Sequence, residues 1–166
     1  MARLVLVGLP GAGKTTLAHL LAQTWGCAVI DTDEVLSAAL GSSPGEYLRT
    51  FGVEAFRREE LAALRRAVAV DAIVATGGGV VSTPEARALL RTQPTIWLDC
   101  ADDELVARVS DGDRPLLGDN APEGLARLRL EREPWYREVA AARVDTAGSA
   151  LKAAARVEAA LAEVSR

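Results

Sequence analysis

The chain has 166 residues, 49% of them hydrophobic and 25% charged, which is the usual composition of a single globular domain large enough to bury a core. Its formal net charge of −4 argues against nucleic-acid binding, because nucleic-acid-binding proteins carry a basic surface. No hydrophobic run approaches the roughly 18 residues of a membrane span, and the first strand begins without a signal peptide. We therefore expect a cytoplasmic protein that binds neither nucleic acid nor membranes.

Short apolar runs alternate with longer helical patterns along the chain. The expected strands are Arg3–Val7, Cys27–Ile30, Ala72–Ala75, Thr95–Leu98 and Ala142–Val144. The expected helices are Lys14–Thr24, Asp33–Leu40, Pro44–Thr50, Val53–Val70, Pro84–Arg91, Asp102–Val109, Pro122–Ala140 and Ser149–Val164, the last with an apolar stripe of Leu151, Ala154, Val157, Leu161 and Val164. Strands without polar alternation indicate a parallel sheet covered on both faces. We predict an α/β fold, a three-layer α/β/α sandwich, formed by one domain over residues 1–166.

The segment after the first strand is the most specific motif. Residues 8–15 read GLPGAGKT, which fits the phosphate-binding pattern GxxxxGK[ST] in the strand–loop–helix context that the motif requires. The glycines let backbone N–H groups converge on an anion, and the following helix adds its positive dipole end. Of the 19 basic residues only Lys14 and Lys152 are lysines. We predict that a nucleoside triphosphate and its Mg²⁺ are bound here, by Gly11, Ala12, Gly13, Lys14, Thr15 and Thr16.

The second expected strand ends in Asp31-Thr32-Asp33. Ligands of open α/β sheets bind at the carboxyl ends of the strands, and alternation in an extended segment places both carboxylates on one side with Thr32 turned away. One carboxylate could hold the Mg²⁺ shell through water and the other could meet a substrate hydroxyl. Capping of the next helix by Asp33 is the alternative role, and the two roles are compatible.

Two further segments have both a functional and an ordinary interpretation. Gly77-Gly78-Gly79 after the third strand allows close approach of a ligand to the backbone, or forms a simple turn. The segment 110–122 is polar and rich in glycine and proline. It is either a surface connection or a lid that delivers Arg114 to the nucleotide. Most arginines of this arginine-rich chain must be solvated, and spacing alone does not select functional ones.

Six motifs, in this order, resemble those of the shikimate kinases: GLPGAGKT (8–15), DTD (31–33), FRREE (56–60), GGG (77–79), DRPLL (113–117) and REPWYREVA (132–140). The resemblance covers essentially the whole chain. It implies a monomeric P-loop kinase of the nucleoside monophosphate kinase-like fold, with a five-stranded parallel sheet. Such an enzyme phosphorylates the 3-hydroxyl of shikimate with ATP and Mg²⁺, on the pathway to chorismate and the aromatic amino acids. The implied substrate-binding segment is about 32–60, and the implied lid is about 110–122.

For the nucleotide, the resemblance implies that Lys14 contacts the phosphates and that Thr15 and Asp31 position Mg²⁺. Arg114 would reach from the lid to the transferring phosphoryl group. Arg108 matches an arginine that lies against adenine, if the lid is one residue short.

For the acceptor, the resemblance implies that Asp33 binds shikimate hydroxyls and is the general base. Arg57 and Arg132 would grip the substrate carboxylate, with Glu60 orienting Arg57. Gly77, Gly78 and Gly79 would line the same pocket. A planar guanidinium suits a carboxylate better than a lysine does.

Two departures and two alternatives remain. The loop 145–149 has no arginine, where relatives often place one near adenine, and Pro44-Gly45 stands where a helix is expected to start cleanly. One alternative function is a gluconate kinase or another small-metabolite kinase of the same fold. The other is a catalytically inactive nucleotide-binding regulatory module.

Overall fold

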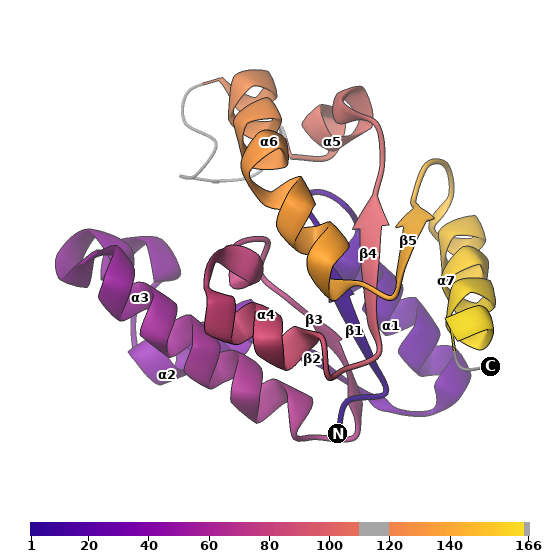
Figure 1. The fold of residues 1–166 in the computed structure, drawn as a ribbon, viewed down its shortest axis with the longest axis horizontal. Coiled ribbons are helices and arrows are strands. Elements are labelled where there is room, and N and C mark those ends of the chain that lie inside the picture. Colours follow the sequence, from indigo (N-terminus) through magenta and orange to yellow (C-terminus); the bar gives the residue numbers. More distant parts are fainter. Residues whose placement is uncertain (110–119, 165–166) are drawn as a thin grey trace.

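A computed structural model describes residues 1–109 and 120–164 of the chain. Its centre is a five-stranded sheet of order β2-β3-β1-β4-β5, in which all neighbouring strands are parallel (Figure 1). The strands are β1 (Leu4–Val7), β2 (Ala28–Asp31), β3 (Ala72–Ala75), β4 (Thr95–Asp99) and β5 (Ala142–Asp145). Every residue of β1, β3 and β4 is buried, as expected for central strands covered on both faces. The predicted α/β class and five parallel strands are confirmed.

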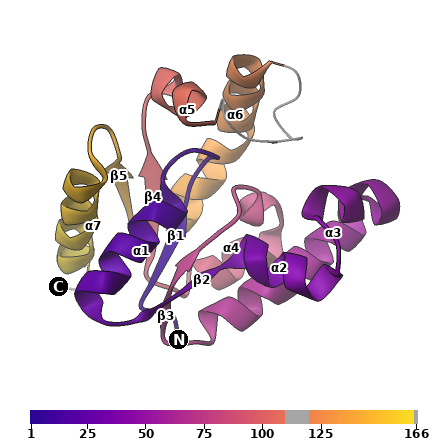
Figure 2. The ribbon, with the colours of Figure 1, turned by 180° about the vertical axis from the view of Figure 1, so that it is seen from behind.

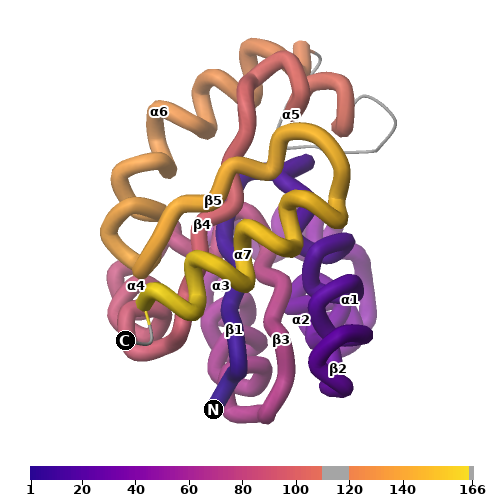
Figure 3. The backbone as a smooth tube through the Cα atoms, turned by 90° about the vertical axis from the view of Figure 1, so that its right-hand side faces the viewer, coloured from indigo at the N-terminus to yellow at the C-terminus, as the bar shows by residue number. Residues whose placement is uncertain are grey.

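Helices cover both faces of this sheet. They are α1 (Lys14–Trp25), α2 (Thr32–Leu40), α3 (Pro44–Val68), α4 (Pro84–Leu90), α5 (Asp102–Val109), α6 (Ala121–Val139) and α7 (Ala150–Val164), with a short 3₁₀ turn η1 (Val80–Ser82). Figures 1 and 2 show α1 and α7 on one face and α4 and α6 on the other, with α2 and the first half of α3 projecting beyond the β2 edge. The side view in Figure 3 shows the sheet between the two helical layers.

The predicted helices Pro44–Thr50 and Val53–Val70 form a single kinked element, α3. The kink lies at Gly52, whose φ of 82° and ψ of 172° are non-helical. Pro44 does not disturb the start of α3, because it occupies the first turn, where its missing N–H costs nothing. Ser43 caps this end by accepting a hydrogen bond from the Glu46 N–H at 3.2 Å.

The apolar stripe predicted for the last helix is partly wrong. Ala153 and Val157 are the buried residues of α7, whereas Leu151 is 73% exposed and Val164 is also exposed. Leu151 precedes Ala153 by two positions, about 200° around a helix, so it points away from the sheet. In the part of the chain that the structure describes, no helix is long and apolar enough to cross a membrane.

Candidate active site

The loop between β1 and α1 lies against β4 and α5. A Cβ atom at Gly8, whose φ is 151°, would lie 2.3 Å from the Leu98 carbonyl oxygen. A Cβ at Gly11, with φ of 82°, would lie 2.8 Å from Val109 Cγ1. Glycine is therefore needed at both positions, and the loop is held in one shape by its neighbours.

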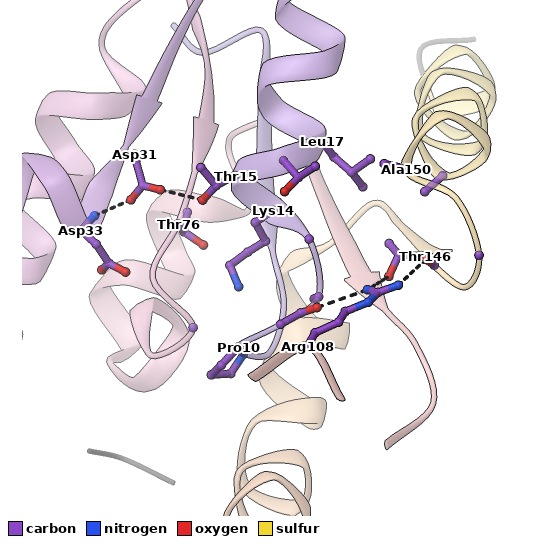
Figure 4. A pocket seen from close by; sticks show the side chains of 17 residues that line it. Pro10, Lys14, Thr15, Leu17, Asp31, Asp33, Thr76, Arg108, Thr146 and Ala150 are labelled. Atoms are coloured by element: carbon purple, nitrogen blue, oxygen red, sulfur yellow. Dashed lines mark hydrogen bonds between the residues drawn. The ribbon is translucent and has the colours of Figure 1, made fainter. Parts of the chain in front are cut away.

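A cavity of about 530 Å³ opens above this loop (Figure 4). The six residues predicted to bind the phosphates all line it: Gly11, Ala12, Gly13, Lys14, Thr15 and Thr16. Lys14 Nζ donates hydrogen bonds to the carbonyl oxygens of Gly8, at 2.8 Å, and Leu9, at 3.0 Å. These bonds hold its ammonium group beside the loop that would carry the phosphates.

Asp31 and Asp33 line the same cavity. Thr15 Oγ1 donates to Asp31 Oδ2 at 2.8 Å, and Asp31 Oδ1 accepts from the Asp33 N–H at 2.9 Å (Figure 4). Asp31 is thus the N-cap of α2, which corrects the alternative that Asp33 caps it. The helix begins at Thr32, one residue earlier than expected, and this places Asp33 in its first turn.

Thr32 is buried beneath the two aspartates. Its hydroxyl accepts a hydrogen bond from the Gly77 N–H at 2.9 Å, and this bond ties the end of β2 to the glycine segment after β3. A Cβ at Gly77 would lie 2.5 Å from Asp33 Oδ1, so glycine makes room there for the carboxylate.

The oxygen atoms around Thr15 and Asp31 suit Mg²⁺, which takes one or two protein carboxylates together with phosphate oxygens and water. Among residues 1–109 and 120–164 no group of three or more His, Cys, Asp or Glu side chains is placed to enclose a metal ion.

Arg108 reaches the other end of the cavity from α5. Its Nη2 donates to the Thr146 carbonyl oxygen at 2.9 Å and its Nη1 to that of Gly11 at 3.2 Å. Arg156 of α7 donates to the carbonyl oxygens of Asp145 and Ala147, both at 3.0 Å. The loop after β5 has no arginine of its own, yet two arginines from neighbouring helices hold its backbone.

A second cavity, of about 550 Å³, lies beside the first. The two share Pro10, Asp33 and Gly78. The remaining predicted acceptor residues also line the second cavity: Arg57, Glu60, Gly77, Gly79 and Arg132. Asp33 therefore stands at the boundary between a phosphate-binding cavity and a cavity lined by arginines.

Arg57 is held by a carboxylate and by the glycine segment. Its Nη1 lies 2.6 Å from Glu60 Oε2 and donates to the Gly79 carbonyl oxygen at 3.2 Å. Burial raises the pKa of the Glu60 carboxyl, and the nearby Arg57 opposes this shift. A Cβ at Gly79 would lie 2.6 Å from Arg57 Nη1, so the close approach needs glycine.

Arg132 is the most unusual charged residue of the site. It is only 2% exposed, and its Nε and Nη1 atoms have no hydrogen-bond partner in the described part of the chain. Burying a guanidinium whose N–H groups lack acceptors destabilises the fold unless a bound anion accepts their hydrogen bonds. The second cavity is thus prepared for a negatively charged ligand.

Some residues of the site were missed by sequence reasoning. Glu34, Leu48, Arg49 and Phe56 also line the second cavity. Pro44 and Leu48 are spaced by four residues, which puts them on one helical face, but nothing in the sequence says what this face covers. Arg114 and most of the predicted lid, residues 110–119, lie outside the described residues.

Comparison with known proteins agrees with this geometry. Residues 10–162 match the family described as shikimate kinase. A shikimate kinase of Frankia casuarinae is 42% identical over 87% of this chain and 65% of its own length. One from Corynebacterium jeikeium is 40% identical over 82% of this chain and 75% of its own length.

Solved structures extend the comparison to the fold. The shikimate kinase of Acinetobacter baumannii in complex with shikimate superposes with a TM-score of 0.87 at 30% identity, over 97% of this chain and 91% of its own. A gluconokinase from Sinorhizobium meliloti superposes with a TM-score of 0.66 at 20% identity, which shows the shared fold alone, over 97% of this chain and 91% of its own. The match to the family over most of the chain is decisive: this protein belongs to the shikimate kinase family.

Proposed function

We propose that this protein transfers the γ-phosphoryl group of ATP to the 3-hydroxyl of shikimate, on the route to chorismate and the aromatic amino acids. The observation that carries the proposal is the position of Asp33, which lines both the cavity of the phosphate loop and the cavity of the buried Arg132. A group at this boundary can touch an acceptor hydroxyl while a nucleotide occupies the other side.

In the nucleotide half, residues 11–16 bind the phosphates and Lys14 neutralises their charge. Thr15 and Asp31 would hold Mg²⁺, which would neutralise charge on the phosphates. Arg108 lies against the adenine, and Arg114 comes from a lid of about residues 110–122.

In the acceptor half, residues about 32–60 form the substrate-binding segment. Arg132 and Arg57 bind the carboxylate of shikimate, and Gly77, Gly78 and Gly79 line the pocket. Because Glu60 already neutralises part of the Arg57 charge, the buried Arg132 is the stronger anion site. The neighbouring Leu48 and Phe56 form an apolar surface against which the ring of the acceptor can pack.

The transfer needs one proton acceptor. The acceptor oxygen attacks the γ-phosphorus, the bond from that phosphorus to the bridging oxygen of ADP breaks, and the hydroxyl proton passes to the Asp33 carboxylate. An aspartate is a weak base, but it suffices when the transition state is loose and the proton leaves late.

A coupled ADP-release assay with ATP and Mg²⁺ tests the function against shikimate, gluconate and nucleoside monophosphates. Turnover on shikimate is expected. Turnover on gluconate alone would overturn the proposal, and ATP binding without turnover on any acceptor would point to a regulatory module. The chain offers a matched control, because Lys14→Met should abolish turnover while Lys152→Met, which changes the other lysine, should not.

A further inference from the structure

Tyr136 lies one helical turn after Arg132 on α6 and is 1% exposed. Its hydroxyl donates a hydrogen bond to the Gly78 carbonyl oxygen at 2.5 Å. Its ring stacks on the buried Trp97 of β4, with ring centroids 6.0 Å apart and planes 25° apart. Tyr136 lines neither cavity, but it contacts the glycine segment that lines both.

The charge of Arg132 also acts on this hydroxyl. Burial raises the pKa of Tyr136, while the charge and hydrogen bond of the neighbouring Arg132 act in the opposite direction. The phenol therefore remains protonated at physiological pH. Its single hydrogen is used toward Gly78, so its lone pairs are left to accept from the guanidinium.

Gly78 lies next to both Tyr136 and Arg132. A Cβ at Gly78 would lie 3.4 Å from Arg132 Nη1, so the guanidinium faces Gly78 with room between them for a single methyl group. Within residues 1–109 and 120–164, the Nε and Nη1 atoms of Arg132 have no hydrogen-bond partner. The tyrosine hydroxyl is thus bonded to the glycine that the charged end of Arg132 faces.

We propose that Tyr136 is a positioning residue for acceptor binding: its hydroxyl holds Arg132 and Gly78 in the relative orientation that receives the carboxylate of the substrate. This inference rests on the proposed function. It predicts that loss of the hydroxyl weakens recognition of the acid and leaves the nucleotide half unchanged.

The test is Tyr136→Phe, which keeps the ring against Trp97 and removes only the hydroxyl. We expect KM for shikimate to rise about tenfold, as for loss of a hydrogen bond to a charged group. The kcat value and KM for ATP should stay within about twofold. Tyr47→Phe is the matched control, because Tyr47 is the only other tyrosine and lines neither cavity. It should change none of these values.

Two further measurements separate positioning from a merely structural role. With the methyl ester of shikimate, which has no carboxylate, Tyr136→Phe should have no effect on KM. In an Arg132→Met background the effect on the acid should also disappear. Equal KM increases for the acid and the ester would overturn the inference, as would an undiminished effect without Arg132.

The outcomes distinguish this inference from the proposed function. If the unaltered protein does not phosphorylate shikimate, the proposed function is wrong. If it does, and Tyr136→Phe folds but keeps its KM for shikimate, the positioning role is wrong. Thermal unfolding of each variant checks folding. Should Tyr136→Phe not fold, Tyr136→Met is the second variant, and it must lose preference for the acid over the ester.

Discussion

The two cavities differ in how they are built. The nucleotide cavity takes most of its predicted ligands from one uninterrupted segment, residues 11–16, in which backbone geometry does the binding. The acceptor cavity is assembled from α2, α3, the glycine segment and α6. A contiguous loop can be identified from its own sequence, whereas an assembled cavity depends on distant residues meeting correctly.

The cations of the two cavities differ as well. Lys14 is already bonded to two carbonyl oxygens of its own loop, so it is held in place before any nucleotide arrives. Arg132 is buried with two N–H-bearing atoms unsatisfied in the described structure. The acceptor cavity therefore holds a desolvated positive charge that an anionic substrate would neutralise. We expect substitutions that remove this charge to weaken substrate binding but to raise the free energy of unfolding.

The largest effect is expected at the boundary between the cavities. Asp33→Asn removes the proton acceptor and keeps the shape, so kcat should fall about 10³-fold while ATP binding is nearly unchanged. Calorimetric titration with ATP and a steady-state assay measure the two quantities. Glu54→Gln, at an exposed position of α3 that lines neither cavity, is the control. A near-normal kcat in Asp33→Asn would show that Asp33 is not the proton acceptor.

Arg132→Met tests the role of the buried positive charge in the acceptor cavity. Without the guanidinium, KM for shikimate should rise about 100-fold. The free energy of unfolding should increase by about 1 kcal/mol, because an apolar side chain of similar volume replaces a buried charge. Urea denaturation and kinetics measure the two effects.

The control for this change is Arg137→Met, on the same helix, where Arg137 is exposed and paired with Glu133. Its effects on KM and on stability should both be small. A loss of stability in Arg132→Met as large as its loss of binding would mean that Arg132 supports the fold rather than the ligand.

Glu60, in the acceptor cavity, makes the stability of the protein depend on pH. Burial raises its folded-state pKa above the ordinary value of 4.5, so the folded protein holds this proton more tightly than the unfolded chain. The resulting stabilisation is present below pH 4.5 and is lost as pH rises through the folded-state pKa. The free energy of unfolding of Glu60→Gln should fall less steeply with pH across this window than that of the unaltered protein. Parallel curves would show that Glu60 does not titrate there.

The difference between the cavities also explains what the sequence could predict. The phosphate loop, the strands and the two aspartates at the end of β2 follow from local patterns of glycines, apolar runs and strand ends. The bond from Thr32 to Gly77 and the contact of Tyr136 with Gly78 join segments far apart in the chain. No local pattern predicts such contacts, and Arg57, Glu60 and Arg132 are assigned to the acceptor only through the family resemblance.

Exposed residues show a second reason. The helical pattern predicts Leu151 in an apolar stripe, yet Leu151 faces away from the sheet, because helical periodicity alone does not fix how a helix is rotated against its neighbours. Nothing in the sequence around Arg156 predicts that it holds the loop after β5 from a helix. Both cases depend on packing between elements rather than on the pattern within one.

The smallest expected effect comes from Arg49, an exposed residue of α3 that lines the acceptor cavity. Within the described residues no hydrogen bond or ion pair holds its side chain, so it acts on an approaching acid mainly through its charge. Arg49→Ala should raise KM for shikimate about twofold to threefold at low salt, and the difference should disappear near 1 M salt, where the Debye length is only about 3 Å. Arg65→Ala, at an exposed position near the other end of the same helix, removes the same charge away from the cavity and should leave KM unchanged. A salt-independent increase would instead indicate direct contact of Arg49 with the bound acid, which would add a third arginine to the assembled cavity.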